Sequence, residues 1–222
     1  MIKRKVVIFD SDGTIENSIF HIISSMKDAA REAGLDEPSE NDIRNIIGLS
    51  LGDAVQILFP NLQVFEIESL IKRYRVCYRM FQEMEWGLFE NVEATLNAMK
   101  DSNYLLAVAT GKSRDGLDRS LRLSGLADMI DISITAEETA SKPNPQMLLE
   151  LINYFDVSPT AALMVGDSKY DLEMAQNVPI VSIGVTYGVH ERSILIKHSP
   201  IACVDDFEEI QFHVNRYFAE KN

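Results

Sequence analysis

The segment VVIFDSDGT, residues 6–14, indicates the fold of this 222-residue chain. Its first four residues are continuously apolar, which is typical of a strand that is buried on both faces of a parallel sheet. Two carboxylates, Asp10 and Asp12, follow at once, and Gly13 allows the chain to turn and a ligand to approach closely. Open α/β sheets bind their ligands at the carboxyl ends of such strands. An acidic turn in which Asp12 caps a helix is the structural alternative.

Short apolar runs of the same kind recur along the chain, and helix-length segments separate them. This alternation predicts right-handed βαβ units and an α/β fold, a Rossmann-like doubly wound parallel sheet. The expected strands are Val6–Phe9, Leu105–Ala109, Ile130–Ile134, Ala161–Val165, Ile180–Val185 and Ile201–Val204, and the expected helices between them are Val92–Lys100, Arg114–Ser124, Pro145–Phe155 and Asp171–Gln176.

One part of the chain, residues 16–86, departs from this alternation. It contains no convincing strand, and its apolar residues recur at helical spacing in two stretches. Turn signals, among them Gly34 and Gly48, divide these stretches. We therefore expect a small helical unit that is inserted directly after the first strand.

The composition excludes several classes of protein. Asp and Glu number 34 against 21 Lys and Arg, a formal net charge of −13, which disfavours nucleic-acid binding because that affinity comes mostly from basic residues. Two cysteines, Cys77 and Cys203, give neither a disulfide framework nor a CxxC zinc site. No apolar run is long enough to cross a bilayer. The expectation is a cytoplasmic protein with no membrane association and no evident need for a protein partner.

Polar residues follow three later strands as well. TGK, residues 110–112, follows the second strand, Lys142 lies in a proline-flanked turn after the third, and GDSKYD, residues 166–171, follows the fourth. Taken singly, each has a plain structural explanation: a β-to-α turn, a solvated lysine, and a capped helix with an acidic first turn.

Taken together, these motifs predict a charged site, because the carboxyl ends of parallel strands meet at one edge of a sheet. Two carboxylates about 4 Å apart repel each other by on the order of 4 kcal/mol at an effective dielectric near 20. Such a cluster favours a hard divalent cation with oxygen ligands, and Mg²⁺ is the first choice. The side chains expected to converge are those of Asp10, Asp12, Thr110, Lys142, Asp167 and Asp171.

With its four motifs in this order, the chain resembles the phosphatases of the haloacid dehalogenase (HAD) superfamily, in the phosphoglycolate-phosphatase-like branch of subfamily IA. The resemblance spans nearly the whole chain and implies a Rossmann-like core, a helical cap domain and strong Mg²⁺ dependence. It implies that residues 1–15 and 87–222 form the core and residues 16–86 the cap. Glu16–Ser18 and Gly87–Asn91 would be the hinges on which the cap closes and excludes water.

The resemblance also implies catalytic roles. Asp10 would be the nucleophile that forms an aspartyl-phosphate, and Asp12 would protonate the leaving oxygen and then deprotonate the attacking water. Thr110 and the Gly111 N–H would hold the phosphoryl oxygens, and Lys142 would offset the charge of nucleophile and phosphate. The implied Mg²⁺ ligands are Asp10, the backbone carbonyl of Asp12, Asp167, and Asp171, the last directly or through a water.

Substrate contacts are expected from both domains. Backbone N–H groups near Ser11 and Gly111 would bind the phosphate. In the cap, Arg44 is the best candidate to meet an anionic substrate group, with a solvated helix arginine as the alternative, and Lys112 is a second candidate. The family's common Leu-Val-Asp-Ser is replaced by IENS, residues 15–18, so the cap's contacts are expected to differ while the chemistry stays.

The leading hypothesis is a Mg²⁺-dependent phosphatase that hydrolyses a small phosphorylated metabolite, a monoester such as phosphoglycolate or a sugar phosphate. A phosphomutase of the β-phosphoglucomutase kind is the alternative, because it shares every catalytic residue named above. Loss of a core motif would have favoured a third hypothesis, a non-catalytic binding protein. The residues that argue against it are all present: Asp10, Asp12, Lys142 and Asp167.

Overall fold

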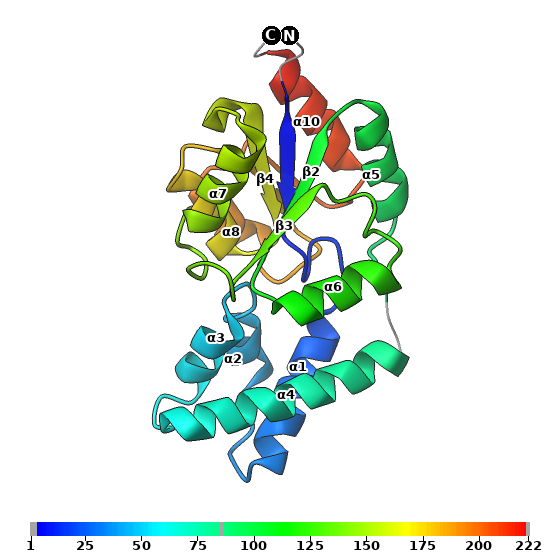
Figure 1. Ribbon diagram of the computed structural model, residues 1–222. Coiled ribbons are helices and arrows are strands. Elements are labelled where there is room, and N and C mark those ends of the chain that lie inside the picture. The colour runs from blue at the N-terminus through cyan, green and yellow to red at the C-terminus, as the bar shows by residue number, and fades with distance from the viewer. Residues whose placement is uncertain (1–3, 85–86, 221–222) are drawn as a thin grey trace.

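The structure is a computed structural model that describes residues 4–84 and 87–220. Its centre is a six-stranded sheet in the order β3-β2-β1-β4-β5-β6, and every pairing in it is parallel (Figure 1). The prediction of a doubly wound parallel α/β sheet is confirmed, and each strand falls on a predicted apolar run with its ends shifted by two residues at most. The strands are β1 Val6–Phe9, β2 Leu105–Thr110, β3 Ile132–Thr135, β4 Ala162–Gly166, β5 Val181–Val185 and β6 Ala202–Val204.

Helices cover both faces of the sheet, which explains why its strands are continuously apolar. Along β1, Val7 and Phe9 contribute to the core on one face, and Val6 and Ile8 to the core on the other. Helices α5 Val92–Asp101, α6 Arg114–Leu123 and α10 Glu209–Ala219 contribute to the first core, and α7 Gln146–Phe155 and α8 Lys169–Gln176 to the second. Shorter elements are η1 Pro159–Ala161, α9 Arg192–Leu195 and η2 Ile196–His198.

Helices α1 to α4, which precede α5 between β1 and β2 in the described part of the sequence, form a separate layer beyond the lower end of the sheet in Figure 1. Helix α1 packs along α4, and these helices have an apolar core of their own that includes Met26, Val55 and Leu70. They occupy the part of the chain where the cap was expected, although its last two residues, 85 and 86, lie outside the described residues. The helices are α1 Ile19–Glu32, α2 Glu40–Arg44, α3 Leu51–Leu58 and α4 Val64–Met84.

The strand order positions the site. Strand β1 lies between β2 and β4, and the connections lead away from it in both directions, so a crevice opens beyond the carboxyl ends of β1 and β4. Helices α1 to α4, for which we keep the short name cap, cover this end of the sheet (Figure 1). Among the helices described in 4–84 and 87–220, none has the length and apolarity that crossing a membrane requires.

Candidate active site

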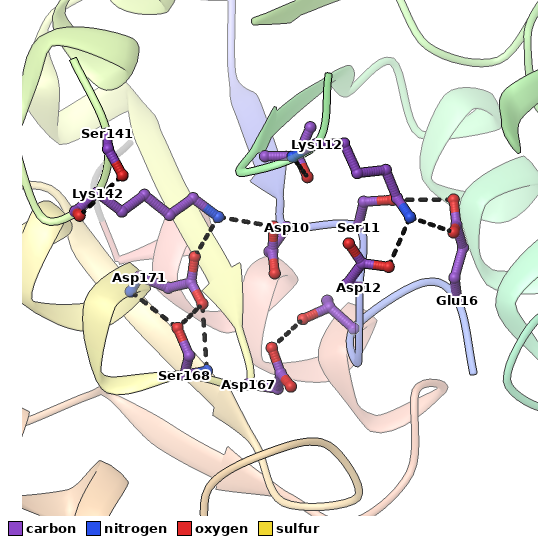
Figure 2. Close-up of polar contacts among 12 residues, drawn as sticks. Asp10, Ser11, Asp12, Glu16, Lys112, Ser141, Lys142, Asp167, Ser168 and Asp171 are labelled. Atoms are coloured by element: carbon purple, nitrogen blue, oxygen red, sulfur yellow. Dashed lines mark hydrogen bonds and ion pairs between the residues drawn. The ribbon is translucent and has the colours of Figure 1, made fainter. Parts of the chain in front are cut away.

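The carboxyl ends of three adjacent strands bring the sequence motifs together. Asp10 follows β1, Thr110 ends β2, and Asp167 follows β4. Strand β1 pairs with both of its neighbours in register, so these side chains emerge side by side. Lys142 reaches the same place from the loop after β3 (Figure 2).

Lys142 connects two of the carboxylates. Its Nζ lies 2.6 Å from Asp10 Oδ1 and 2.6 Å from Asp171 Oδ1, and all three side chains are buried. A buried ammonium group requires such partners. Burial alone would lower the pKa of Lys142, but the charges of Asp10 and Asp171 outweigh it and hold that pKa above its ordinary value.

Asp171 also fixes the start of helix α8. Its Oδ2 accepts hydrogen bonds from Ser168 Oγ at 2.6 Å and Ser168 N at 3.1 Å, which is one half of a capping box. A side chain at Gly166 would place its Cβ 2.4 Å from Asp171 Cβ. The structural and the functional explanations of this motif are therefore compatible. The hydrogen bonds that begin helix α8 also orient the Asp171 carboxylate toward Lys142.

Asp167 is held by a tight backbone arrangement. Its carboxylate accepts hydrogen bonds from Val189 N at 2.7 Å and Thr14 Oγ1 at 3.3 Å. Gly13 has φ +79°, and a Cβ there would lie 2.0 Å from Asp167 Oδ2, so this position requires glycine. Gly188 packs as closely from the other side, since its Cβ would lie 2.2 Å from Asp167 Cβ. Burial raises the pKa of Asp167 well above its usual range, and the charges of nearby carboxylates add to this.

Three carboxylates have the arrangement of a metal site. Asp10, Asp167 and Asp171 each offer an oxygen, and these oxygens all lie within 4.8 Å of one another. Asp10 Oδ2 is buried and has no hydrogen-bond partner among the described residues. Burial raises the pKa of Asp10 to about 7 despite Lys142. An all-oxygen donor set with excess negative charge fits a hard divalent cation such as Mg²⁺.

The carboxylate of Asp12 lies outside this cluster and forms a second one (Figure 2). Asp12 Oδ1 accepts hydrogen bonds from Lys112 Nζ at 2.5 Å and Ser18 Oγ at 2.5 Å, and Tyr78 OH lies 3.5 Å away. Lys112 Nζ also lies 3.1 Å from Glu16 Oε2 and 3.1 Å from Tyr78 OH. Lys112, which was expected to bind substrate, is therefore occupied in holding Asp12.

Glu16 is a further residue of the candidate site, and no sequence motif indicated its place there. It is buried, and its Oε1 accepts hydrogen bonds from Ser11 Oγ at 2.9 Å and from Ser120 Oγ. Burial would lower the pKa of Lys112, but Asp12 and Glu16 together raise it. The available signal was the departure from the family pattern at residues 15–18, which replaces its aspartate and introduces this glutamate. A buried Lys112 between two carboxylates is the physical consequence.

A cavity of about 230 Å³ lies between the sheet edge and the cap. Asp10, Asp12, Thr110 and Gly111 line it from the core. Its apolar wall belongs to the cap and consists of Ile22, Met26, Ile46, Ile47, Leu49, Leu51, Ala54, Tyr74 and Tyr78. The volume is below the range of about 300–1,000 Å³ that holds drug-sized ligands, so a small substrate fits.

Arg44 is not among the residues that line this cavity. Its Nε lies 3.1 Å from Glu40 Oε1, one turn back in α2, and both side chains are exposed. Ile43, the preceding residue, is fully buried in the cap, which turns Arg44 outward because neighbours on a helix point in different directions. The expectation that Arg44 contacts the substrate is therefore corrected. Arg44 is a solvated helix arginine, which was the alternative interpretation.

The loop between α2 and α3, residues 45–50, contacts the site directly, and we call it the cap loop. Ser50 N donates a hydrogen bond to Ser141 Oγ at 2.8 Å, next to Lys142. A Cβ at Gly111 would lie 2.3 Å from Leu49 O, so only glycine allows this approach. The cap and core are thus in contact around the cavity, and a further contact joins Tyr170 OH to Asn45 O at 2.7 Å.

Comparisons with known proteins agree with this geometry. A family model described as haloacid dehalogenase-like hydrolase matches residues 7–185. The probable phosphatase IndB of Dickeya dadantii (strain 3937) is 31% identical over 93% of this chain and 92% of its own length, and the pyrophosphatase PpaX of Bacillus cereus (strain Q1) is 28% identical over 94% and 95%. The crystal structure of a predicted phosphoglycolate phosphatase from Haemophilus somnus 129PT has a TM-score of 0.85 and 26% identity, over 96% of this chain and 99% of that one.

Proposed function

The chain belongs to the family of haloacid dehalogenase-like hydrolases and is a phosphatase, and from this premise we propose that it is Mg²⁺-dependent and hydrolyses a small phosphate monoester through an aspartyl-phosphate. The observation that carries the proposal is Asp10 Oδ2, a buried carboxylate oxygen without a hydrogen-bond partner, on a residue that lines the cavity beside Asp12. The other oxygen of Asp10 is held by Lys142, so Oδ2 is the one available for attack.

In the first step, Asp10 Oδ2 attacks phosphorus, and the bond between phosphorus and the ester oxygen breaks. Asp12 gives a proton to that leaving oxygen. In the second step, Asp12 takes a proton from water, the water oxygen attacks phosphorus, and the bond to Asp10 breaks to release orthophosphate. Covalent catalysis of this kind divides one difficult transfer into two easier ones.

Neighbouring groups orient this chemistry. Thr110 Oγ1 accepts a hydrogen bond from Lys112 N at 3.2 Å, which leaves its own hydroxyl proton free to donate to a phosphoryl oxygen. Lys142 offsets negative charge beside Asp10. Lys112 and Ser18 fix the position of the Asp12 carboxylate, and because Ser18 lies at the start of the expected cap, the position of the general acid–base residue depends on the cap as well as the core.

Asp10, Asp167 and the backbone carbonyl of Asp12 would hold Mg²⁺. Asp171, which accepts hydrogen bonds from Lys142 and Ser168, would hold the ion directly or through a water. When bound, the metal would supply positive charge to the phosphoryl oxygens. Binding a cation would also offset the burial, and with it the carboxylate repulsion, that raise the pKa of Asp10 and Asp167.

The small cavity and the relatives support the proposed substrate class. A probable phosphatase, a pyrophosphatase and a predicted phosphoglycolate phosphatase are among the similar proteins. These support a small phosphorylated metabolite, of the phosphoglycolate or sugar phosphate type, as the substrate of this chain.

The test is phosphate release from a panel of phosphate monoesters, p-nitrophenyl phosphate included, with Mg²⁺ and with EDTA. The expected result is metal-dependent release by wild type and its loss in Asp10→Asn. Interconversion of phosphate isomers without net release would favour the phosphomutase instead. Equal release in EDTA would contradict the metal dependence.

A further inference from the structure

Two hydrogen-bond donors of the cavity have no acceptor within residues 4–84 and 87–220. Gln82 Nε2 and Arg119 Nε are both shielded from solvent and lack a partner among the described residues, and both residues line the cavity that contains Asp10 and Asp12. Gln82 is only 4% exposed. Because about nine in ten buried polar groups in proteins are paired, two orphaned donors in one cavity indicate a ligand that supplies acceptors.

The two donors come from the cap and the core. Gln82 lies on α4 and Arg119 on α6, the two helices that face each other where cap and core meet (Figure 1). One helical turn earlier, Arg79 Nη2 and Asp115 Oδ2 join these helices at 2.7 Å. Residues three or four apart share a helix face, so Gln82 follows Arg79, and Arg119 follows Asp115, along the facing sides.

The charges around the cavity leave Arg119 unmatched. Of the cations that line it, three have a carboxylate partner among the lining residues, and Arg119 has none within the described part of the chain. Asp10, the remaining lining carboxylate, is already paired with Lys142. A positive charge without a counterion favours an anionic group over a neutral acceptor. The three pairs are Arg75 with Glu137, Arg79 with Asp115, and Lys112 with Asp12.

We propose that Gln82 and Arg119 bind a second anionic group, a carboxylate or phosphoryl group on the leaving-group side of the substrate. This inference rests on the proposed phosphatase function and specifies its substrate class: phosphate compounds whose leaving group carries a further negative charge. The transferred phosphoryl group lies at Asp10, and the apolar cap wall covers the carbon skeleton between the two ends. Because each protein domain supplies one donor, such a substrate also holds the cap closed.

The test compares two pairs of substrates that differ in the second charge. Phosphoglycolate is paired with 2-hydroxyethyl phosphate for a carboxylate, and pyrophosphate with methyl phosphate for a second phosphoryl group. Wild type is expected to prefer the charged member of at least one pair by tenfold or more in kcat/KM. In Arg119→Gln and Gln82→Leu, kcat/KM for the charged member is expected to fall by about 10- to 100-fold, because each variant removes a hydrogen bond to a charged group. The fall should come mainly from a higher KM.

Two further variants sharpen the comparison. Arg119→Lys keeps the charge and is expected to retain part of the preference. Arg122→Gln changes an exposed arginine of the same helix and is expected to retain all of it. Thermal denaturation checks that each variant folds, and if Arg119→Gln does not, Gln82→Leu and Arg119→Lys decide the question.

Three results would overturn the proposal. Wild type that does not discriminate within either pair has no second anion site. An equal loss on both members of a pair would assign Arg119 to the transferred phosphoryl group or to the fold. Wild type that hydrolyses none of the four compounds nor p-nitrophenyl phosphate would overturn the proposed function itself, which separates that failure from the first two.

Discussion

Replacing Asp10 by asparagine should stabilise the metal-free protein while it abolishes turnover. Asp10 is buried, and its pKa is raised from 3.8 to about 7. The folded state therefore holds this proton more strongly than the unfolded state, and wild type loses stability as the pH rises from about 4 to about 7. At about 1.4 kcal/mol per pH unit, ionising Asp10 costs about 4 kcal/mol at pH 8 and less than half of that at pH 5. Asparagine removes this cost and still offers Lys142 an acceptor.

The assay is urea denaturation of wild type and Asp10→Asn in EDTA at both pH values. The variant should be more stable by up to about 4 kcal/mol at pH 8, a rise in Tm of about 8–16 °C in a chain of this size, and by less than half of that free energy at pH 5. Asp101→Asn, an exposed residue, serves as the matched control and should show no such pH dependence. An advantage that is the same at both pH values, or a less stable variant at pH 8, would refute the reasoning.

The metal site, the Lys112 ion pairs and the exposed Arg44 can each be tested separately. Millimolar Mg²⁺ should raise the Tm of wild type because it binds only the native state, and an equal rise in Asp167→Asn would place the ion elsewhere. Lys112→Met leaves the partly buried Asp12 and the buried Glu16 without their cation and should lower the free energy of unfolding in urea by about 3–5 kcal/mol; a loss below about 1 kcal/mol would contradict the contribution of these ion pairs. Arg44→Gln should change ester turnover less than twofold, and a tenfold loss would restore Arg44 as a substrate contact.

The fold was accessible from the sequence because its strands are buried on both faces. Such strands are continuously apolar and interrupt the helical periodicity, so their positions can be predicted within a residue or two, and β1, Val6–Phe9, was predicted to the residue. The packing of the cap loop was not accessible. It depends on the approach of Leu49 O to Gly111, a backbone contact between segments far apart in the chain that no local pattern encodes.

In the candidate site, too, some features could be predicted from the sequence and others could not. Asp10, Thr110 and Asp167 converge because parallel strands end at one edge, and this requires only the strand assignment. The partners of a long side chain depend on three-dimensional packing instead. Lys112 turns toward Asp12 and a buried glutamate, which spacing along the chain does not predict.

Cap residues were the hardest to assign from sequence. Arg44 follows a buried isoleucine and so faces solvent, although its type suggested a substrate contact. Gln82 lies in an amphipathic helix whose pattern is that of ordinary packing. Its missing acceptor, and that of Arg119, become visible only once the cavity is formed.

The most direct test of the central claim is to trap the covalent intermediate. Wild type is mixed with a turned-over, ³²P-labelled monoester and Mg²⁺, quenched with acid during turnover, and mapped by peptide. An acid-stable label is expected on the peptide that contains Asp10, and no label in Asp10→Asn. Metal-dependent turnover with the label on another residue would contradict Asp10 as the nucleophile.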